Sequence, residues 1–356
     1  MRERFKSQFD AWDEFSILDV QSGSELSRLF DRQASRYVCS LSPNGRWLIA
    51  APRTGAPLEL WDVPSGQKLG ELEGSAQGGV IAFSPDSRHF VASISAEGHS
   101  RGSKSCRLLT WTVDDWETRA EGALAPKARY RSFDGQQRLG EIGHISRLAF
   151  SPDSRLLAIG GIRFRRRPYP DECPGIVRIL DAVTGESKSA PPFDLGKVDA
   201  LTFSPDGEML AAASESMEWI DQDGRQTMFA WTITTRAWLA GEFKQGVIAP
   251  AFSPNGQLFA AAIRGRRFEH PAELRLWGRL PGAANRRYQL RTAENEHLLE
   301  FDRANSGSSV RDDHVLSFTP DGRWLIITAP MKNAVDSSAL DYISLLDVSS
   351  YGKLAD

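Results

Sequence analysis

The chain contains 356 residues, of which 41% are hydrophobic and 25% charged, and its formal net charge is −3. This composition is typical of an ordinary globular protein, and the small net charge gives no general attraction to nucleic acid or membranes. No run of about 18 apolar residues is present, so we expect no segment that spans a bilayer.

The N-terminus, "MRERFKSQFDAWDEF", is charged throughout and lacks the apolar core of a secretory signal. Three cysteines, Cys39, Cys106 and Cys173, lie far apart in the sequence. An odd number of dispersed cysteines favours a reducing compartment over a disulfide framework. We therefore expect a cytoplasmic protein.

The first predicted elements are two strands within residues 15–30, "FSILDVQSGSELSRLF", which flank a turn sequence. From residue 39 onward one phrase recurs: an apolar run, a Ser/Thr-Pro-Asn/Asp turn and a second apolar run. Its copies are "CSLSPNGRWLIAA" from Cys39, "VIAFSPDSRHFVAS" from Val80, "LAFSPDSRLLAIGG" from Leu148, "ALTFSPDGEMLAAA" from Ala200, "APAFSPNGQLFAAA" from Ala249 and "LSFTPDGRWLIIT" from Leu316. A period of roughly 50 residues predicts a repeat architecture.

Each copy of the phrase predicts a β-hairpin. Ser, Pro, Asp and Gly suit the four positions of a type I turn in that order. Neither flanking strand alternates cleanly between apolar and polar residues, which indicates burial on both faces. The second strand is rich in alanine, as in residues 211–213 and 260–262, and small side chains suit a place where neighbouring sheets converge.

A third strand and a tight turn follow in each repeat, as in "LELWDVPSG" (58–66) and "VRILDAVTG" (177–185), and a more polar fourth strand comes next. Four antiparallel strands per repeat, buried inside and wet at the outer edge, are typical of a β-propeller blade. The "LWD" of residues 60–62, the Gly143-His144 dipeptide and the Ser/Thr-Pro-Asn/Asp turns resemble the WD40 repeat. TolB-type propellers are alternative relatives.

The resemblance implies an all-β propeller of about seven four-stranded antiparallel blades. Residues 1–36 would form an N-terminal segment with a half-blade that closes the ring, and residues 37–356 six WD40-like repeats of a single propeller. A six-bladed ring, or a piece of a longer chain, are the alternatives. Gly-His and Trp-Asp each occur only once at the matching place, so the hydrogen-bond set that braces WD40 blades cannot be assembled, and packing must hold the blades.

Insert lengths differ between repeats. The spacing from turn proline to third-strand Trp or Leu is shortest between Pro43 and Trp61 and longer in every later repeat. Two further long spacings run from Trp111 to Pro152 and from Trp277 to Pro320, and we expect them in loops between blades. With antiparallel connectivity, all these inserts would then lie at one end of the molecule, opposite the tight turns. Loops on a rigid scaffold commonly carry binding sites.

Several inserts combine arginine or lysine with aromatic residues, a composition suited to acidic protein segments, phosphopeptides or nucleic acid. The small net charge argues against nucleic acid. The simpler interpretation is that these side chains only solvate surface loops. The acidic insert "SESMEWIDQDGRQ" (214–226) could pair with them. The candidate partner-binding residues are Arg163, Phe164, Arg165, Arg166, Arg167, Tyr169, Arg264, Arg266, Arg267, Phe268, Arg101 and Lys104. The stretch "KARYRSF" (127–133) adds further basic residues, Lys127, Arg129 and Arg131.

Catalytic and metal-binding patterns are weak. Gly98-His99-Ser100-Arg101-Gly102 matches a nucleophile elbow in letters, but it lies in a Ser/Gly-rich loop with no helix after it. The histidines and cysteines show no ligand spacing, so we expect no metal and no cofactor. The inner strands are mostly apolar.

These patterns predict a non-catalytic scaffold that binds a protein or peptide on the loop-bearing face, with no nucleic-acid or membrane partner. One alternative is a propeller hydrolase of the lactonase or glycosidase kind, with a site at the channel mouth. The other is a sensor or regulatory domain cut from a longer chain.

Overall fold

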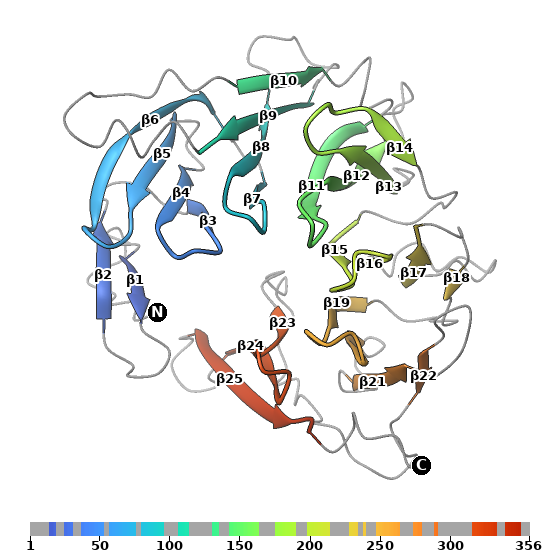
Figure 1. The fold of residues 1–356 in the computed structure, drawn as a ribbon. Helices are drawn as coiled ribbons and strands as arrows, with labels where there is room; N and C mark the ends of the chain where they lie inside the picture. The colour runs from blue at the N-terminus through green and yellow to red at the C-terminus, as the bar shows by residue number, and fades with distance from the viewer. Residues whose placement is uncertain are drawn as a thin grey trace. The chain divides into compact units, whose positions relative to one another are not determined.

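A computed structural model describes residues 14–18, 25–30, 37–52, 57–75, 80–95, 106–113, 130–134, 142–163, 175–189, 198–213, 228–233, 238–239, 247–263, 273–279, 288–290, 315–332 and 339–349. Within these ranges every regular element is a β-strand (Figure 1). The all-β expectation is therefore confirmed for the part of the chain that the structure describes.

The described strands form seven antiparallel sheets in which each strand pairs with its neighbour in sequence. One sheet has two strands, β1 (Glu14–Leu18) and β2 (Glu25–Phe30). The first two four-stranded sheets contain β3 (Tyr37–Leu41), β4 (Trp47–Pro52), β5 (Pro57–Asp62) and β6 (Gln67–Ser75), then β7 (Ile81–Phe83), β8 (His89–Ser95), β9 (Cys106–Thr112) and β10 (Tyr130–Asp134).

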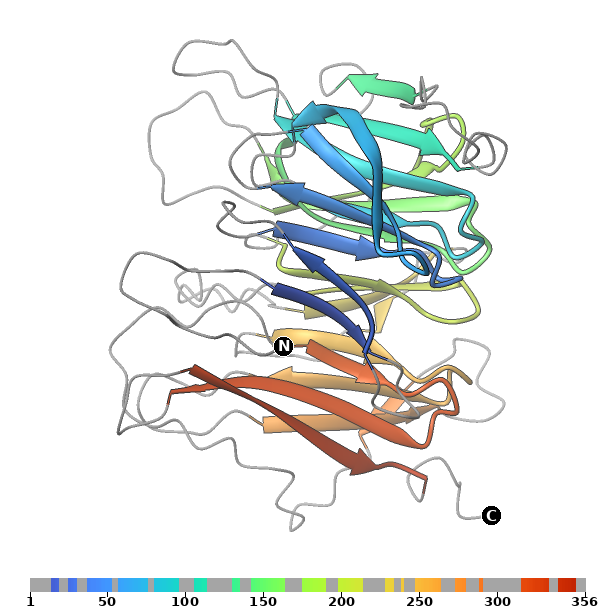
Figure 2. The same ribbon diagram turned by 90° about the vertical axis from the view of Figure 1, so that its left-hand side faces the viewer.

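Three more four-stranded sheets follow, and the last sheet has three described strands. Their members are β11 (Ile142–Phe150), β12 (Leu156–Arg163), β13 (Gly175–Asp181) and β14 (Ser187–Ser189); β15 (Ala200–Phe203), β16 (Met209–Ala213), β17 (Met228–Thr232) and β18 (Trp238–Leu239); β19 (Val247–Phe252), β20 (Leu258–Ile263), β21 (Glu273–Arg279) and β22 (Tyr288–Leu290); and β23 (Val315–Phe318), β24 (Trp324–Lys332) and β25 (Ala339–Asp347). The strands β24 and β25 pair along their full length; they are among the long orange-red and red strands of Figure 2.

The chain divides into two compact units. Unit 1 comprises Met1–Leu157, Arg163–Arg166 and Ile179–Lys188, and unit 2 comprises Ala158–Ile162, Arg167–Arg178 and Ser189–Asp356. The sheet β11–β14 contributes residues to both units, whereas every other sheet belongs to one of them.

The repeated phrase folds as predicted, as a hairpin around a hydrogen-bonded turn. In one copy the Gly207 N–H donates to the Ser204 carbonyl oxygen at 2.8 Å. The Ser204 hydroxyl donates to Asp206 Oδ1 at 2.6 Å and accepts from the Met209 N–H at 2.9 Å. Asp206 Oδ1 also accepts from the Glu208 N–H at 3.0 Å. The serine and aspartate thus satisfy backbone donors that the turn would otherwise leave open.

The same bonds recur in every copy of the phrase. The position after the Asp or Asn has a positive φ in each turn, for example 71° at Gly207. That conformation follows a type I turn in three-residue hairpin loops and favours glycine. The hydroxyl-bearing residues that head the six turns are Ser42, Ser84, Ser151, Ser204, Ser253 and Thr319.

In unit 1, the third-strand tryptophan joins a row of aromatic rings across its sheet. The Trp111 ring stacks on Phe90, with centroids 4.5 Å apart, and Phe83 lies 5.5 Å from Phe90. These rings belong to one buried cluster that also contains Trp47 and Leu58 of the preceding sheet. The Phe-Phe-Trp pattern of the repeat therefore builds the core between neighbouring sheets.

Unit 2 uses the same construction. Phe252, Phe259 and Trp277 follow one another across β19, β20 and β21, with ring centroids 4.7 and 5.4 Å apart. The alanines of β16 lie against this row: Ala211 and Ala213 are fully buried and share a cluster with Phe259. Every residue of β16 is buried, which confirms the expectation of small residues where sheets converge.

Candidate functional site

Each four-stranded sheet has two unlike ends. Because the strands are antiparallel and paired in sequence order, the connections from strand one to two and from three to four share one end, here termed the tight-turn end. The connection from strand two to three lies at the other end, termed the loop end. In the second sheet, the turn at Ser84–Ser87 marks the tight-turn end, and the loop end lies between Ser95 and Cys106.

Within unit 1, the tight turns of successive sheets lie side by side. The Asn44 N–H donates to Ser87 Oγ at 3.1 Å, and the Asp86 N–H donates to Ser154 Oγ at 3.2 Å. These bonds align three tight-turn ends on one side of unit 1. In unit 2, a Cβ at Gly322 would lie 3.6 Å from Pro254 Cδ, so two further turns are also neighbours.

The predicted partner-binding residues all belong to connections that leave loop ends, namely β8 to β9, β12 to β13 and β20 to β21. Arg163 is the last residue of β12, and its backbone is the only described part of the set. The remaining residues lie outside the described ranges: Arg101, Lys104, Phe164, Arg165, Arg166, Arg167, Tyr169, Arg264, Arg266, Arg267 and Phe268. Their convergence into one surface stays a prediction.

One part of the expected distribution of inserts is wrong. The stretch 127–133, predicted to lie in a loop between blades, instead overlaps β10, the fourth strand of its sheet, in which Arg131 pairs with Thr110 of β9. Residues 114–129 therefore connect strand three to strand four, at the tight-turn end. The strand β10 could not be predicted from the sequence, because "YRSF" lacks the apolar run that marks the other strands. The second long insert consists of two parts. Residues 280–287 connect the paired strands β21 and β22, and residues 291–314 connect β22 to β23.

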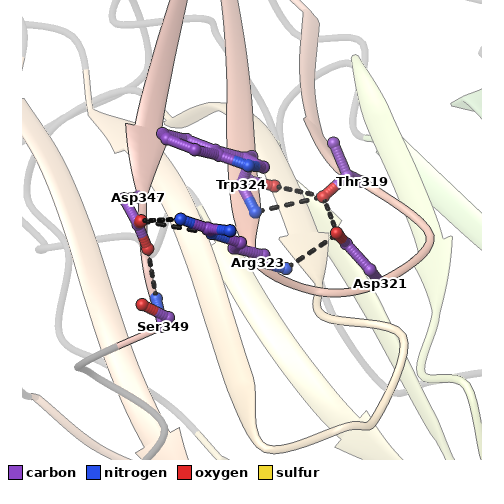
Figure 3. A network of polar contacts seen from close by, with 6 residues as sticks. All are labelled: Thr319, Asp321, Arg323, Trp324, Asp347 and Ser349. Carbon is purple, nitrogen blue, oxygen red and sulfur yellow. Dashed lines mark hydrogen bonds and ion pairs between the residues drawn. The ribbon is translucent and has the colours of Figure 1, made fainter. Parts of the chain in front are cut away.

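The best-defined polar constellation lies at the tight-turn end of the last sheet (Figure 3). Arg323 Nε and Nη2 donate to Asp347 Oδ2 at 3.3 and 3.4 Å, and the guanidinium lies over the Trp324 ring, 5.1 Å from its centroid. The Ser349 N–H donates to Asp347 Oδ1 at 2.9 Å. Hydrogen bonds from Ser349, and then the hydrogen bond and charge of Arg323, outweigh desolvation and lower the pKa of Asp347.

The first repeat contains the same arrangement. Arg46 lies over Trp47 at 4.5 Å and its Nε is 3.9 Å from Asp62 Oδ1. The Ser65 hydroxyl donates to Asp62 Oδ2 at 2.6 Å. The aspartate of the Trp61-Asp62 pair therefore fixes the turn into the fourth strand and anchors an arginine from the neighbouring hairpin. This role was not predicted, although the repeated "RW" after the turn and the "LWD" or "LLD" of strand three are its signal in the sequence.

Unit 1 also contains a buried carboxylate. Glu59 is 9% exposed, accepts from Trp61 Nε1 at 3.1 Å and pairs with Lys68 Nζ at 2.6 Å. Burial alone would lower the pKa of Lys68, but hydrogen bonds to Glu59 and Glu71 raise it above its ordinary value. Burial first, and then the negative charge of Glu59, raise the pKa of the Cys39 thiol to about 12. The carboxylate is fully paired and the thiol is held protonated, so this cluster stabilises the sheet and offers no nucleophile.

In the described ranges, no group of three or more His, Cys, Asp or Glu side chains is arranged to hold a metal ion. No helix long and apolar enough to cross a membrane occurs in that same part of the chain. The Gly98–Gly102 match to a nucleophile elbow lies outside the described residues.

The comparisons with known proteins identify the fold. No family model matches the chain, and no curated protein matches its sequence. A chain in the crystal structure of the mitotic checkpoint complex superposes with a TM-score of 0.58 at 16% identity, covering 94% of this chain and 82% of that one. The β-propeller domain of Myceliophteria thermophila Cps50 (Swd1) gives a TM-score of 0.56 at 14% identity, covering 98% and 96% of the two chains.

These likenesses extend over nearly the whole chain, and the chain folds as a β-propeller of antiparallel blades. The resemblance to WD40 propellers that was drawn from the repeated turns is confirmed at the level of the fold. The number of blades, the half-blade at residues 1–36 and the partner-binding residues stay predictions.

Proposed function

We propose that this propeller is a non-catalytic scaffold that binds a protein or peptide partner through the loop ends of its blades. Arginines of the three basic connections would attract acidic groups, and Phe164, Tyr169 and Phe268 would anchor the partner by burial. A cytoplasmic location belongs to the same proposal, as does the absence of a cofactor.

The observation that supports the proposal is the contrast between the two ends of the sheets. The turns of the repeated phrase are short, and their serine and aspartate side chains are committed to the backbone. The Arg46–Asp62 and Arg323–Asp347 pairs are likewise committed. In contrast, the connections from strand two to strand three carry the basic and aromatic candidate residues. Variable, chemically rich loops on a rigid sheet are where binding sites are commonly built.

Structural likeness adds a second, weaker support. One of the two similar structures is a chain from a multiprotein complex, the mitotic checkpoint complex. At 16% identity this likeness concerns the fold alone, so the partner must be found by experiment.

Charge reversal tests the proposal. Proteins retained from a cell extract by the immobilised chain are identified by mass spectrometry, and the most strongly retained one is purified. Its Kd is then measured for the wild type and for two double variants, Arg165→Glu with Arg166→Glu and Arg264→Glu with Arg266→Glu. We expect each double variant to weaken binding at least about tenfold, and raised salt to weaken binding by the wild type.

A matched control reverses two charges at the tight-turn end. Arg88 is exposed and the Arg155 side chain is 85% exposed, so Arg88→Glu with Arg155→Glu changes the net charge equally without touching the loop ends. The control should bind like the wild type. Equal loss in all three double variants would indicate a nonspecific charge effect, and no loss in the loop-end variants would show that those arginines only solvate the loops.

A further inference from the structure

Two of the six repeated turns have serine in place of glycine at the position with a positive φ. Ser87 has a φ of 60° and Ser154 a φ of 61°, whereas the equivalent positions elsewhere are Gly45, Gly207, Gly256 and Gly322 with φ between 66° and 72°. A side chain in this left-handed region is strained, because Cβ crowds the backbone. A strained residue persists where the surrounding structure compensates for it.

The compensation lies in the neighbouring turn. Ser87 Oγ accepts from the Asn44 N–H at 3.1 Å, and Ser154 Oγ accepts from the Asp86 N–H at 3.2 Å. Both serines are buried, with 9% and 8% of their surface exposed. Each bond joins the third residue of one turn to the fourth residue of the next. Glycine has no hydroxyl with which to accept such a bond.

We propose that Ser87 and Ser154 are interblade staples that join the first three tight turns of unit 1 into one hydrogen-bonded row. The row fixes the spacing of three neighbouring sheets at their tight-turn ends. Strand contacts between β3 and β7 and between β7 and β11 continue the same association along the sheets. The inference does not depend on the proposed function, since it concerns the opposite end of the sheets.

Hydrogen exchange of two specific amides tests the staples. Ser87→Gly should accelerate exchange at the Asn44 amide by roughly two- to tenfold and leave the Asp86 amide unchanged. Ser154→Gly should do the reverse. Glycine accepts a positive φ without strain, so neither variant is expected to prevent folding. Unchanged exchange at both partner amides would overturn the proposal, and so would equal acceleration of both amides in both variants, because that pattern reports general destabilisation.

A second test introduces a serine at the equivalent position of another turn. A Cβ at Gly322 would meet Pro254 Cδ at 3.6 Å, an ordinary van der Waals contact beside the preceding turn, whereas a Cβ at Gly45 meets no atom within 4 Å. Gly322→Ser should therefore slow exchange at the Asn255 amide, the position that matches Asn44 and Asp86. Gly45→Ser introduces the same strain, but its Cβ has no atom of the described residues within 4 Å, so it should only lower the melting temperature. If Gly322→Ser leaves the Asn255 amide unchanged, the turn-to-turn geometry does not make the staple.

Discussion

At the scale of single residues, the aspartates of the repeated turns are structural acceptors. Burial alone would raise the pKa of Asp86, but the Ser84 hydroxyl, the Arg88 N–H and nearby positive charge outweigh it and lower the pKa. The same balance lowers the pKa of Asp153. At Asp321 the hydrogen bond from Thr319 is the largest cause of the lowered pKa. Two turns use Asn44 and Asn255 instead and accept the same bonds without a charge.

This difference predicts a pH dependence of stability. A carboxyl with a lowered folded-state pKa contributes stability that is fully present above its unfolded pKa of about 4 and is lost as pH falls through the folded value. The triple variant Asp86→Asn, Asp153→Asn, Asp321→Asn should therefore lose less unfolding free energy than the wild type between about pH 6 and about pH 3. Urea unfolding at both pH values measures this. The reciprocal change, Asn44→Asp, should steepen the pH dependence, and a triple variant as acid-sensitive as the wild type would contradict the role given to these carboxylates.

The Cys39 thiol should be unreactive in the folded chain. Its pKa of about 12 leaves little thiolate near neutral pH. We expect alkylation of Cys39 by iodoacetamide at about pH 8 to be at least roughly a hundredfold slower in the folded protein than in urea. Mass spectrometry of the peptide that contains Cys39 measures both rates. Similar rates in the two states would show that the thiol is neither buried nor raised in pKa.

At the scale of elements, the second strand of each hairpin is limited by side-chain size. Ala211, Ala213 and Ala261 are fully buried and pack in the cluster that joins two neighbouring sheets of unit 2. Larger side chains there would separate the sheets or force strained rotamers.

A size increase at this junction should destabilise the protein. We expect Ala211→Leu to lower the unfolding free energy by about 1–3 kcal/mol, measured by urea titration. Leu345→Ala is the control, because that leucine is 60% exposed and its truncation should change stability by no more than about 0.5 kcal/mol. Comparable losses in the two variants would contradict the tight junction.

Hairpins were predictable from sequence because local chemistry determines them. The Ser204 and Asp206 side chains form hydrogen bonds within their own turn, and Gly207 accepts the positive φ that the turn requires. The turn therefore needs no distant partner. The fourth strands were less predictable. The strand β10 at Tyr130–Asp134 is an outer strand whose polar sequence carries no apolar pattern, and its place depends on pairing with β9. The candidate site was likewise predictable only in part. Topology predicts at which end of a sheet a loop lies, but whether several loops converge depends on tertiary packing.

For the molecule as a whole, the repeated hairpin accounts for the fold, and the insertions between strands are the segments in which a function is to be sought. The chain matches propellers along nearly its full length at only 14–16% identity. The connections from strand two to strand three differ in length, but residues 114–129 show that the tight-turn end also accepts an insertion. A partner search should therefore begin at the loop ends and include that insertion as a separate deletion variant.

The turns that contain Asn44 and Asn255 have an Asn-Gly sequence, which is prone to deamidation. An Asn-Gly sequence loses its amide through a cyclic imide when the following backbone nitrogen attacks the side-chain carbonyl. In the first turn that nitrogen, on Gly45, is held to the Ser42 carbonyl oxygen at 2.8 Å, and the Asn44 side-chain oxygen is held by the Ser42 hydroxyl and the Arg46 N–H. The folded turn thus restrains both reacting groups. Hydrolysis of the imide at its side-chain carbonyl yields aspartate, the residue that neighbouring turns already employ, whereas hydrolysis at its backbone carbonyl yields isoaspartate.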